Sequence, residues 1–96
     1  MRAQLLYRSK SLLSDGAIVE LVIWIVPEPL FGSRHSYKYS LFYGYPGQRI
    51  VGYDNERGKG DHKHILDREE AYTFSTIEKL VDDFRRDVEL RRRRGR

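Results

Sequence analysis

Residues 54–64 carry side chains that can transfer protons and hold phosphate, and no apolar side chain lies among them. Two histidines, His62 and His64, stand one residue apart in this stretch. If the stretch is extended, both imidazoles lie on one face of it, about 6.6 Å apart, a separation that can straddle one phosphate. A neutral imidazole can take the proton of an RNA 2′-hydroxyl while a protonated one protonates the leaving 5′-oxygen. The pair therefore favours metal-free cleavage of an RNA phosphodiester.

Other polar side chains would complete such a site. Asp54 is the acidic candidate, and His35, the only other histidine, can replace either imidazole if the fold brings it near. Fixed cations stabilise the negative charge that develops on phosphorus in the transition state. The predicted catalytic set is His62, His64, Asp54 and His35, and the predicted substrate-binding set is Arg57, Lys59, Lys63, Tyr53 and Asn55.

Three rival interpretations of the same residues stay open. The two histidines with Asp54 and Asp61 offer ligands to zinc or manganese, but their spacing fits no well-defined motif, so we predict no metal ligand and no cofactor. The segment can also be a structural or nucleic-acid-contacting loop, because polar stretches with glycine are usually solvated connectors. Asp54 or Asn55 can instead cap a strand end through an Asx turn.

The composition favours one small folded domain. The chain has 96 residues, of which 40% are hydrophobic and 33% charged, and it contains no cysteine. Disulfides and thiolate metal sites are thereby excluded, which fits a reducing compartment. No apolar run approaches the roughly 20 residues of a membrane-spanning helix, and the first residues show no secretory signal. We therefore expect a cytoplasmic protein that does not contact a membrane.

The last six residues differ from the rest of the chain in charge. They contain five arginines, whereas the formal net charge of the whole chain is +4, so residues 1–90 alone are slightly acidic. We predict one domain over 1–90 and a basic C-terminal tail over 91–96. Such a run can neutralise nucleic-acid phosphates, or it can be a helix end whose cations suit the negative end of the helix dipole.

Two hairpins are predicted in the first half of the chain. The β-branched run 17–26 is typical of a central strand, and the turn residues at 14–16 connect it to an earlier strand within 4–13. Pro27 and Pro29 then forbid ladder hydrogen bonds, so a loop should run to about residue 36. Alternating tyrosines predict a second hairpin, with strands at 37–45 and 49–53, and its tyrosine face should be half-buried core.

The C-terminal part predicts a short strand and a helix. The strand is expected at 71–74, and Ser75 with Glu78 fits the capping box that starts a helix. The apolar residues of this helix recur at helical spacing and should pack on the sheet: Ile77, Leu80, Val81, Phe84 and Val88. The opposite helix face should meet water: Lys79, Asp82, Asp83, Arg86 and Asp87. We therefore predict an α+β fold in which a small antiparallel sheet of four to five strands packs against one C-terminal helix.

Three stretches of the sequence, 37–44, 51–64 and 72–74 with the helix after it, resemble the TumE family of small bacterial and archaeal toxins. The resemblance covers nearly the whole chain to about residue 90, without the arginine run, and its most specific part runs from Tyr-Asp-Asn to His-x-His. The positions that match the family's motif are Tyr53, Asp54, Asn55, His62 and His64, with His35 as a further match.

TumE-like proteins are assigned as toxins of toxin–antitoxin pairs, typically encoded beside a helix-turn-helix antitoxin. The resemblance thus implies a toxin role and a helix-turn-helix antitoxin as partner, which we expect to cover segment 54–64. RNA as the target follows from the side chains alone, and a homo-oligomer stays open because the core is small. Two rival classes remain. One is a non-enzymatic module that joins a DNA-bound regulator; the other is a metal-dependent nuclease or nucleotide-modifying enzyme with the same His and Asp residues.

Overall fold

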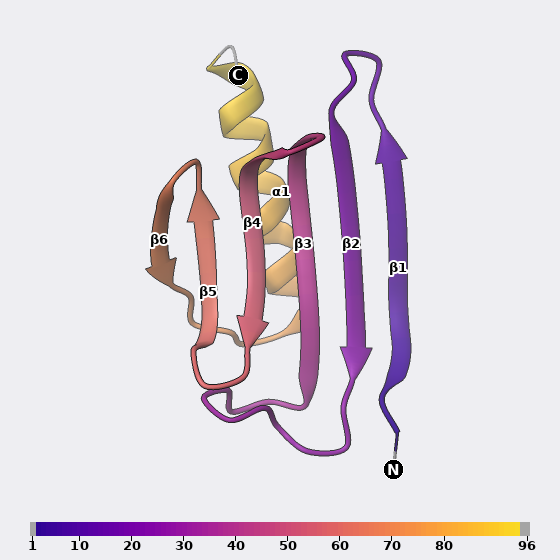
Figure 1. Ribbon diagram of the computed structural model, residues 1–96, viewed down its shortest axis with the longest axis vertical. Helices are drawn as coiled ribbons and strands as arrows, with labels where there is room; N and C mark the ends of the chain where they lie inside the picture. The colour runs from indigo at the N-terminus through magenta and orange to yellow at the C-terminus, as the bar shows by residue number, and fades with distance from the viewer. Residues whose placement is uncertain (1, 95–96) are drawn as a thin grey trace.

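The computed structural model describes residues 2–94, in which six antiparallel strands form one sheet in sequential order (Figure 1). The strands are β1 (Gln4–Leu12), β2 (Ile18–Ile25), β3 (Tyr37–Tyr45), β4 (Gln48–Glu56), β5 (Gly60–Ile65) and β6 (Arg68–Ala71), and helix α1 (Ile77–Arg93) follows them. The helix lies behind β3 and β4 in Figure 1, so the face of the sheet toward the viewer is open. The predicted α+β arrangement is confirmed, with a slightly higher strand count than expected.

Turn chemistry sets the two hairpins where the sequence predicts them. Asp15 Oδ1 accepts the N–H of Ala17 at 3.1 Å, and Gly16 adopts a φ of 88°, which glycine reaches without steric cost. Strand β2 ends before the two prolines, and the following connection runs to residue 36 as predicted. Strand β3 covers the predicted residues 37–45, and β4 is longer than expected because it extends into the polar segment.

The core lies between the sheet and α1. The buried residues of β2, β3 and β4 that face the helix are mostly odd-numbered, among them Leu21, Ile23, Tyr39, Leu41, Tyr43, Val51 and Tyr53. Leu80 and Phe84 of α1 are fully buried against them, and the rings of Tyr53 and Phe84 meet edge to face at 5.9 Å between centroids. Burial of each large apolar side chain stabilises the fold by about 1.5–3 kcal/mol. The tyrosine face is core, as predicted.

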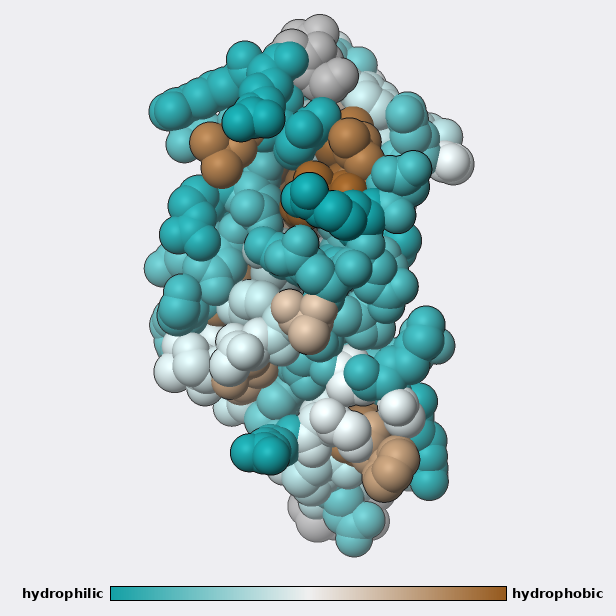
Figure 2. Space-filling view, turned by 90° about the vertical axis from the view of Figure 1, so that its left-hand side faces the viewer, coloured by the Kyte–Doolittle hydropathy of each residue, from teal (hydrophilic) through white to brown (hydrophobic). Residues whose placement is uncertain are grey.

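The last strand lies earlier than predicted. Strand β6 covers residues 68–71 and not 71–74, because a tight turn at 66–67 reverses the chain directly after β5. Leu66 in this turn has a φ of 58°. Residues 68–71 are all exposed and mostly charged, and the β6 edge of the molecule is largely hydrophilic in Figure 2. Charged side chains on an edge strand disfavour pairing with another chain.

Helix α1 starts one residue later than the predicted capping box implies. Its N-cap is Thr76, whose Oγ1 accepts the N–H of Lys79 at 3.0 Å. A threonine in extended conformation before the first turn satisfies one of the helix's free N–H groups, and Ser75 lies outside the helix. The predicted apolar face is confirmed, since two of its five residues are buried and the other three are partly buried against the core.

Two aspartates predicted to face water instead hold α1 against Tyr53 of β4 and against Tyr72, the residue after β6. Asp83 accepts the Tyr72 hydroxyl at 2.7 Å, and Asp87 accepts the Tyr53 hydroxyl. Burial and these carboxylates raise the pKa of Tyr53 and of Tyr72. For Asp83, burial acts to raise the pKa, but hydrogen bonds from Tyr72 and Lys79 outweigh it and hold the pKa below its ordinary value. The expectation that polar residues of a helix face water misses both aspartates, because each tyrosine hydroxyl needs a hydrogen-bond acceptor between the helix and the rest of the protein.

Three of the four described arginines of the C-terminal run belong to the helix, and the fourth, Arg94, is its C-cap. Residues 91–93 form its last turn, where cations suit the negative end of the dipole. Arg92 donates to the Tyr43 hydroxyl at 2.9 Å and lies 3.4 Å from Asp15 Oδ2. The predicted division of the chain at residue 90 stays a prediction, and Arg96 lies outside the described residues.

Candidate active site

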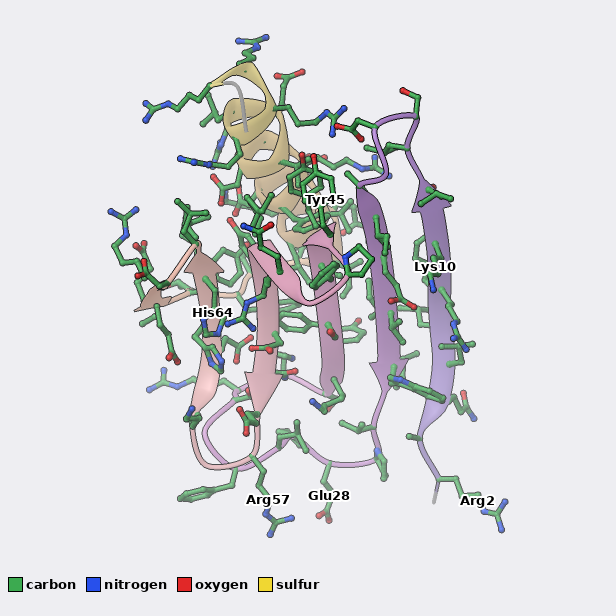
Figure 3. All side chains as sticks on the ribbon, turned by 45° about the horizontal axis from the view of Figure 1, so that its top comes forward. Arg2, Lys10, Glu28, Tyr45, Arg57 and His64 are labelled. Atoms are coloured by element: carbon green, nitrogen blue, oxygen red, sulfur yellow. The ribbon has the colours of Figure 1, made fainter. Side chains whose placement is uncertain are left out.

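Strand register brings three candidate residues to the open face of the sheet. Directly paired residues share a face, and faces alternate along each strand. One row of paired residues is Ser40, Asp54, His62 and Ala71, and the next is Phe42, Gly52, His64 and Glu69. Figure 3 shows the labelled His64 on β5, on the side of the sheet away from α1. Asp54, His62 and His64 therefore meet on a surface that no helix covers.

Segment 54–64 is a hairpin, and the interpretation of it as a loop is wrong. Residues 54–56 end β4, residues 57–59 turn, and residues 60–64 lie in β5. Pairing with β4 on one side and β6 on the other satisfies the backbone of β5 without any apolar side chain. Gly58 and Gly60 adopt φ values of 86° and 76°, which the tight turn requires.

His62 is braced between two acceptors beside His64. Its side chain is 6% exposed, with Nε2 2.7 Å from Asp54 Oδ1 and 3.7 Å from Glu69 Oε2. Its Nδ1 lies 3.2 Å from the Gly60 carbonyl oxygen. The rings of His62 and His64 meet edge to face, with centroids 5.1 Å apart. One ligand atom from each of Asp54, His62 and His64 lies within 4.8 Å of the other two, so the three groups share one point of approach.

One oxygen of this cluster is left without a hydrogen bond. Asp54 Oδ1 is buried and has no hydrogen-bond donor among the described residues. His62 Nε2 lies 2.7 Å from this oxygen, a contact that is an ion pair when the imidazole is protonated, and the Asp54 side chain as a whole is 31% exposed. An unsatisfied buried oxygen costs about 1–3 kcal/mol. Asp54 Oδ1 therefore meets His62 Nε2 without a counted hydrogen bond.

Arg49 is a candidate functional residue that the sequence analysis missed. A β-bulge opposite Tyr43 and Gly44 shifts the register of β4, so that Arg49 pairs with Gly44 on the open face. Its side chain lies over Gly52, where an added Cβ would stand 2.6 Å from Arg49 Cδ. Burial first, and then the charge of Arg49, lower the pKa of His64. The one feature of the sequence that could have indicated this position is Gly52. Because it has no side chain, the space between Phe42 and His64 is left to the side chain of Arg49.

The structure does not bring the predicted cations to the imidazoles. Lys63 points to the helix face, where its Nζ is 3.4 Å from Asp87 Oδ2 and 5.6 Å from the centre of the Tyr53 ring. Arg57 and Lys59 lie in the exposed β4–β5 turn, and Figure 3 shows Arg57 at the end of that hairpin, pointing away from the sheet. Arg49 is the cation beside the histidine pair.

His35 lies on the opposite side of the sheet from the other two histidines. Its Nε2 is 2.6 Å from Asp61 Oδ2, and its ring packs on Phe74 at 3.9 Å between centroids. Asp61 also accepts the hydroxyls of Ser33 and Tyr39, at 2.6 and 2.7 Å. The β2–β3 connection thus closes over the helix side of β5, and His35 cannot reach the point that His62 and His64 share.

Asn55 and Tyr53 also face the helix side. The amide of Asn55 is fully buried: Oδ1 accepts the N–H of Tyr39 at 3.0 Å, and Nδ2 donates to the Tyr37 carbonyl at 2.7 Å. These bonds continue the β3–β4 pairing beyond Ser40 and Asp54, where the ladder ends. The strand-end interpretation of Asn55 thus fits the geometry, through cross-strand bonds and not through an Asx turn.

Comparison with known proteins assigns the chain to a family. A family model described as "Toxin TumE" matches residues 2–92, which include every strand, nearly all of α1 and the whole open-face cluster. No curated protein and no solved structure gives a significant match. Within residues 2–94, no helix is long and apolar enough to cross a bilayer. Because the match spans almost the full length, the chain belongs to the TumE toxin family.

Proposed function

We propose that this toxin cleaves RNA by metal-free acid–base catalysis at the open-face site. The observation that carries the proposal is the pairing of two imidazoles on an uncovered surface, with ring centroids 5.1 Å apart and the Arg49 side chain beside them. Both nitrogens of His62 lie near acceptors, whereas no hydrogen bond to another described residue engages His64. His62 is therefore the acid and His64 the base.

The reaction breaks one phosphodiester bond without a cofactor. His64 removes the proton from an RNA 2′-hydroxyl, and the 2′-oxygen attacks the adjacent phosphorus. His62 gives its proton to the leaving 5′-oxygen, so the products are a 2′,3′-cyclic phosphate and a 5′-hydroxyl. Asp54 orients His62 from the neighbouring strand, and Arg49 stabilises the negative charge of the pentacoordinate transition state.

The partner of the toxin is a helix-turn-helix antitoxin, and the toxin acts in the cytoplasm, where RNA is accessible. Membership of a toxin family supports an antitoxin partner. The open face is the surface that such a partner must occupy to block the reaction, because Asp54, His62 and His64 all project from it. We therefore expect the antitoxin to cover this face of the sheet and not a flexible loop.

Expression of the chain without an antitoxin tests the proposal. Growth should stop, and the purified protein should cleave RNA to fragments that end in a cyclic phosphate. His62→Ala and His64→Ala should each relieve the arrest while circular dichroism shows an unchanged fold. Arg57→Ala, at the exposed turn away from the cluster, is the matched control and should stay toxic. If both histidine variants fold and stop growth as strongly as the unaltered chain, the catalytic assignment is wrong.

A further inference from the structure

The open-face cluster has the donor set of a transition-metal site. It combines one carboxylate and two imidazoles, a set that suits zinc and its neighbours, whereas magnesium and calcium prefer oxygen ligands throughout. The three ligand atoms lie within 4.8 Å of one another. Ligand atoms about 2.1 Å from one tetrahedral ion lie about 3.4 Å apart, so binding needs the side chains to close by up to about 1.4 Å.

The contact between Asp54 and His62 agrees with such a site. Asp54 Oδ1 is buried with no hydrogen-bond partner among residues 2–94, although His62 Nε2 lies 2.7 Å away. A bound cation would satisfy the oxygen and keep the fold unchanged, since both residues stand on paired strands.

The surroundings supply a further carboxylate. Glu69 on β6 lies opposite His64, and its Oε2 is 3.7 Å from His62 Nε2. With Asp54 it gives two negative charges next to the single guanidinium of Arg49. Glu69 is exposed, so it can close the fourth position of a tetrahedral ion or leave that position to water.

We infer that Asp54, His62 and His64 bind one zinc-type divalent ion, and that the bound ion holds the toxin inactive. Coordination occupies the lone pair with which His64 would accept the RNA proton, and it separates Asp54 from the ring that it orients. The ion binding stands on the donor geometry alone. The inactivation rests on the proposed function, because it assumes that the free imidazoles carry out the cleavage.

Titration of Zn²⁺ into chelator-treated protein, followed by calorimetry, tests the binding. We expect one ion per chain, and a Co²⁺ complex with the visible absorption of a nitrogen–oxygen site. His64→Ala and Asp54→Ala should each weaken binding at least tenfold. His35→Ala is the matched control, because it removes a histidine that also contacts an aspartate but lies on the other side of the sheet. The absence of saturable binding, or binding that survives both open-face variants, would overturn the site.

An RNA-cleavage assay separates the two halves of the inference. Zinc-loaded protein should be inactive, and removal of zinc by EDTA should restore cleavage. If stoichiometric binding through these ligands is found but the zinc-free protein does not cleave RNA, the metal site stands and the proposed function fails. If cleavage requires zinc, the inactivating role is overturned, and so is the metal-free mechanism.

Discussion

The two faces of the sheet each hold a histidine next to an aspartate, and the pairs differ in how completely they are satisfied. On the helix face, Asp61 accepts three hydrogen bonds. Because the Tyr37 N–H donates to His35 Nδ1, the proton of the His35 ring is on Nε2, which donates it in a hydrogen bond to Asp61. On the open face, Asp54 Oδ1 contacts His62 without a hydrogen bond. The same two residue types thus serve structure on one face and remain available for chemistry on the other.

The largest expected effect is the loss of cleavage in His64→Ala. Removal of a general base slows a reaction by about 10²–10⁴-fold. Stability should barely change, because the side chain donates no hydrogen bond to another described residue. The rate of cleavage of a short RNA, measured with zinc removed, gives the first quantity, and a urea melt gives the second. A folded variant within threefold of the original rate would break the distinction between the two faces.

The two aspartates should differ in their contribution to stability. Asp61→Ala leaves three donors in part-buried hydrogen bonds without an acceptor and should lower the free energy of unfolding by about 3 kcal/mol. Asp54→Ala removes an oxygen that is already unsatisfied and should cost less than about 1 kcal/mol. Urea denaturation of both variants measures the difference. Equal losses would show that Asp54 is as structural as Asp61.

Arg49→Ala sharpens the comparison by removing the cation of the open face. Cleavage should slow by about 10–100-fold, since the guanidinium acts on charge that develops in the transition state. Gly52→Ala should act in the same direction, because its Cβ would stand 2.6 Å from Arg49 Cδ and displace that side chain. Steady-state kinetics of both variants check this effect. Lys63→Ala, on the helix face, is the control and should keep the original rate. If Lys63→Ala slows cleavage and Arg49→Ala does not, the stabilising cation lies on the helix face and the role given to Arg49 is wrong.

The smallest expected effect is an acid-dependent weakening of the helix side. The pKa of Asp83 is lowered in the folded state, so its contribution is present above the unfolded pKa of about 3.9 and is lost as pH falls through the folded value. Asp83→Asn should cost about 1 kcal/mol at neutral pH and reduce the loss of stability below pH 4. Urea melts between pH 2 and pH 7, about the range that spans these values, provide the test. An unchanged pH profile would remove Asp83 from the docking of α1.

Sequence patterns predict this fold well where one rule acts locally. The alternating tyrosines locate β3, the prolines end β2, and the apolar spacing finds the face of α1 that packs. The patterns miss β6, because its four residues, three of them charged, pair only as the return of a tight turn. They also place Asp83 in water, since sequence alone does not reveal that Tyr72 needs a buried acceptor.

For the site, the sequence predicts the imidazole pair but not its neighbours. Strand periodicity is sufficient to put His62 and His64 on one face. The position of His35 depends on how the β2–β3 connection crosses the sheet, and the position of Arg49 depends on a bulge that shifts β4. Both depend on pairing between strands, which no local pattern in one sequence reports.

The position of the three residues on the β4–β5 hairpin has a consequence for how this site can evolve. Asp54, His62 and His64 come from two consecutive strands joined by one short turn, so eleven successive residues contain the entire set. Such a hairpin can be duplicated, exchanged or grafted as a single cassette, and a one-residue insertion in its turn is enough to pull the set apart. Divergence in this toxin should therefore accumulate in β1 and the rest of the sheet before it reaches this hairpin.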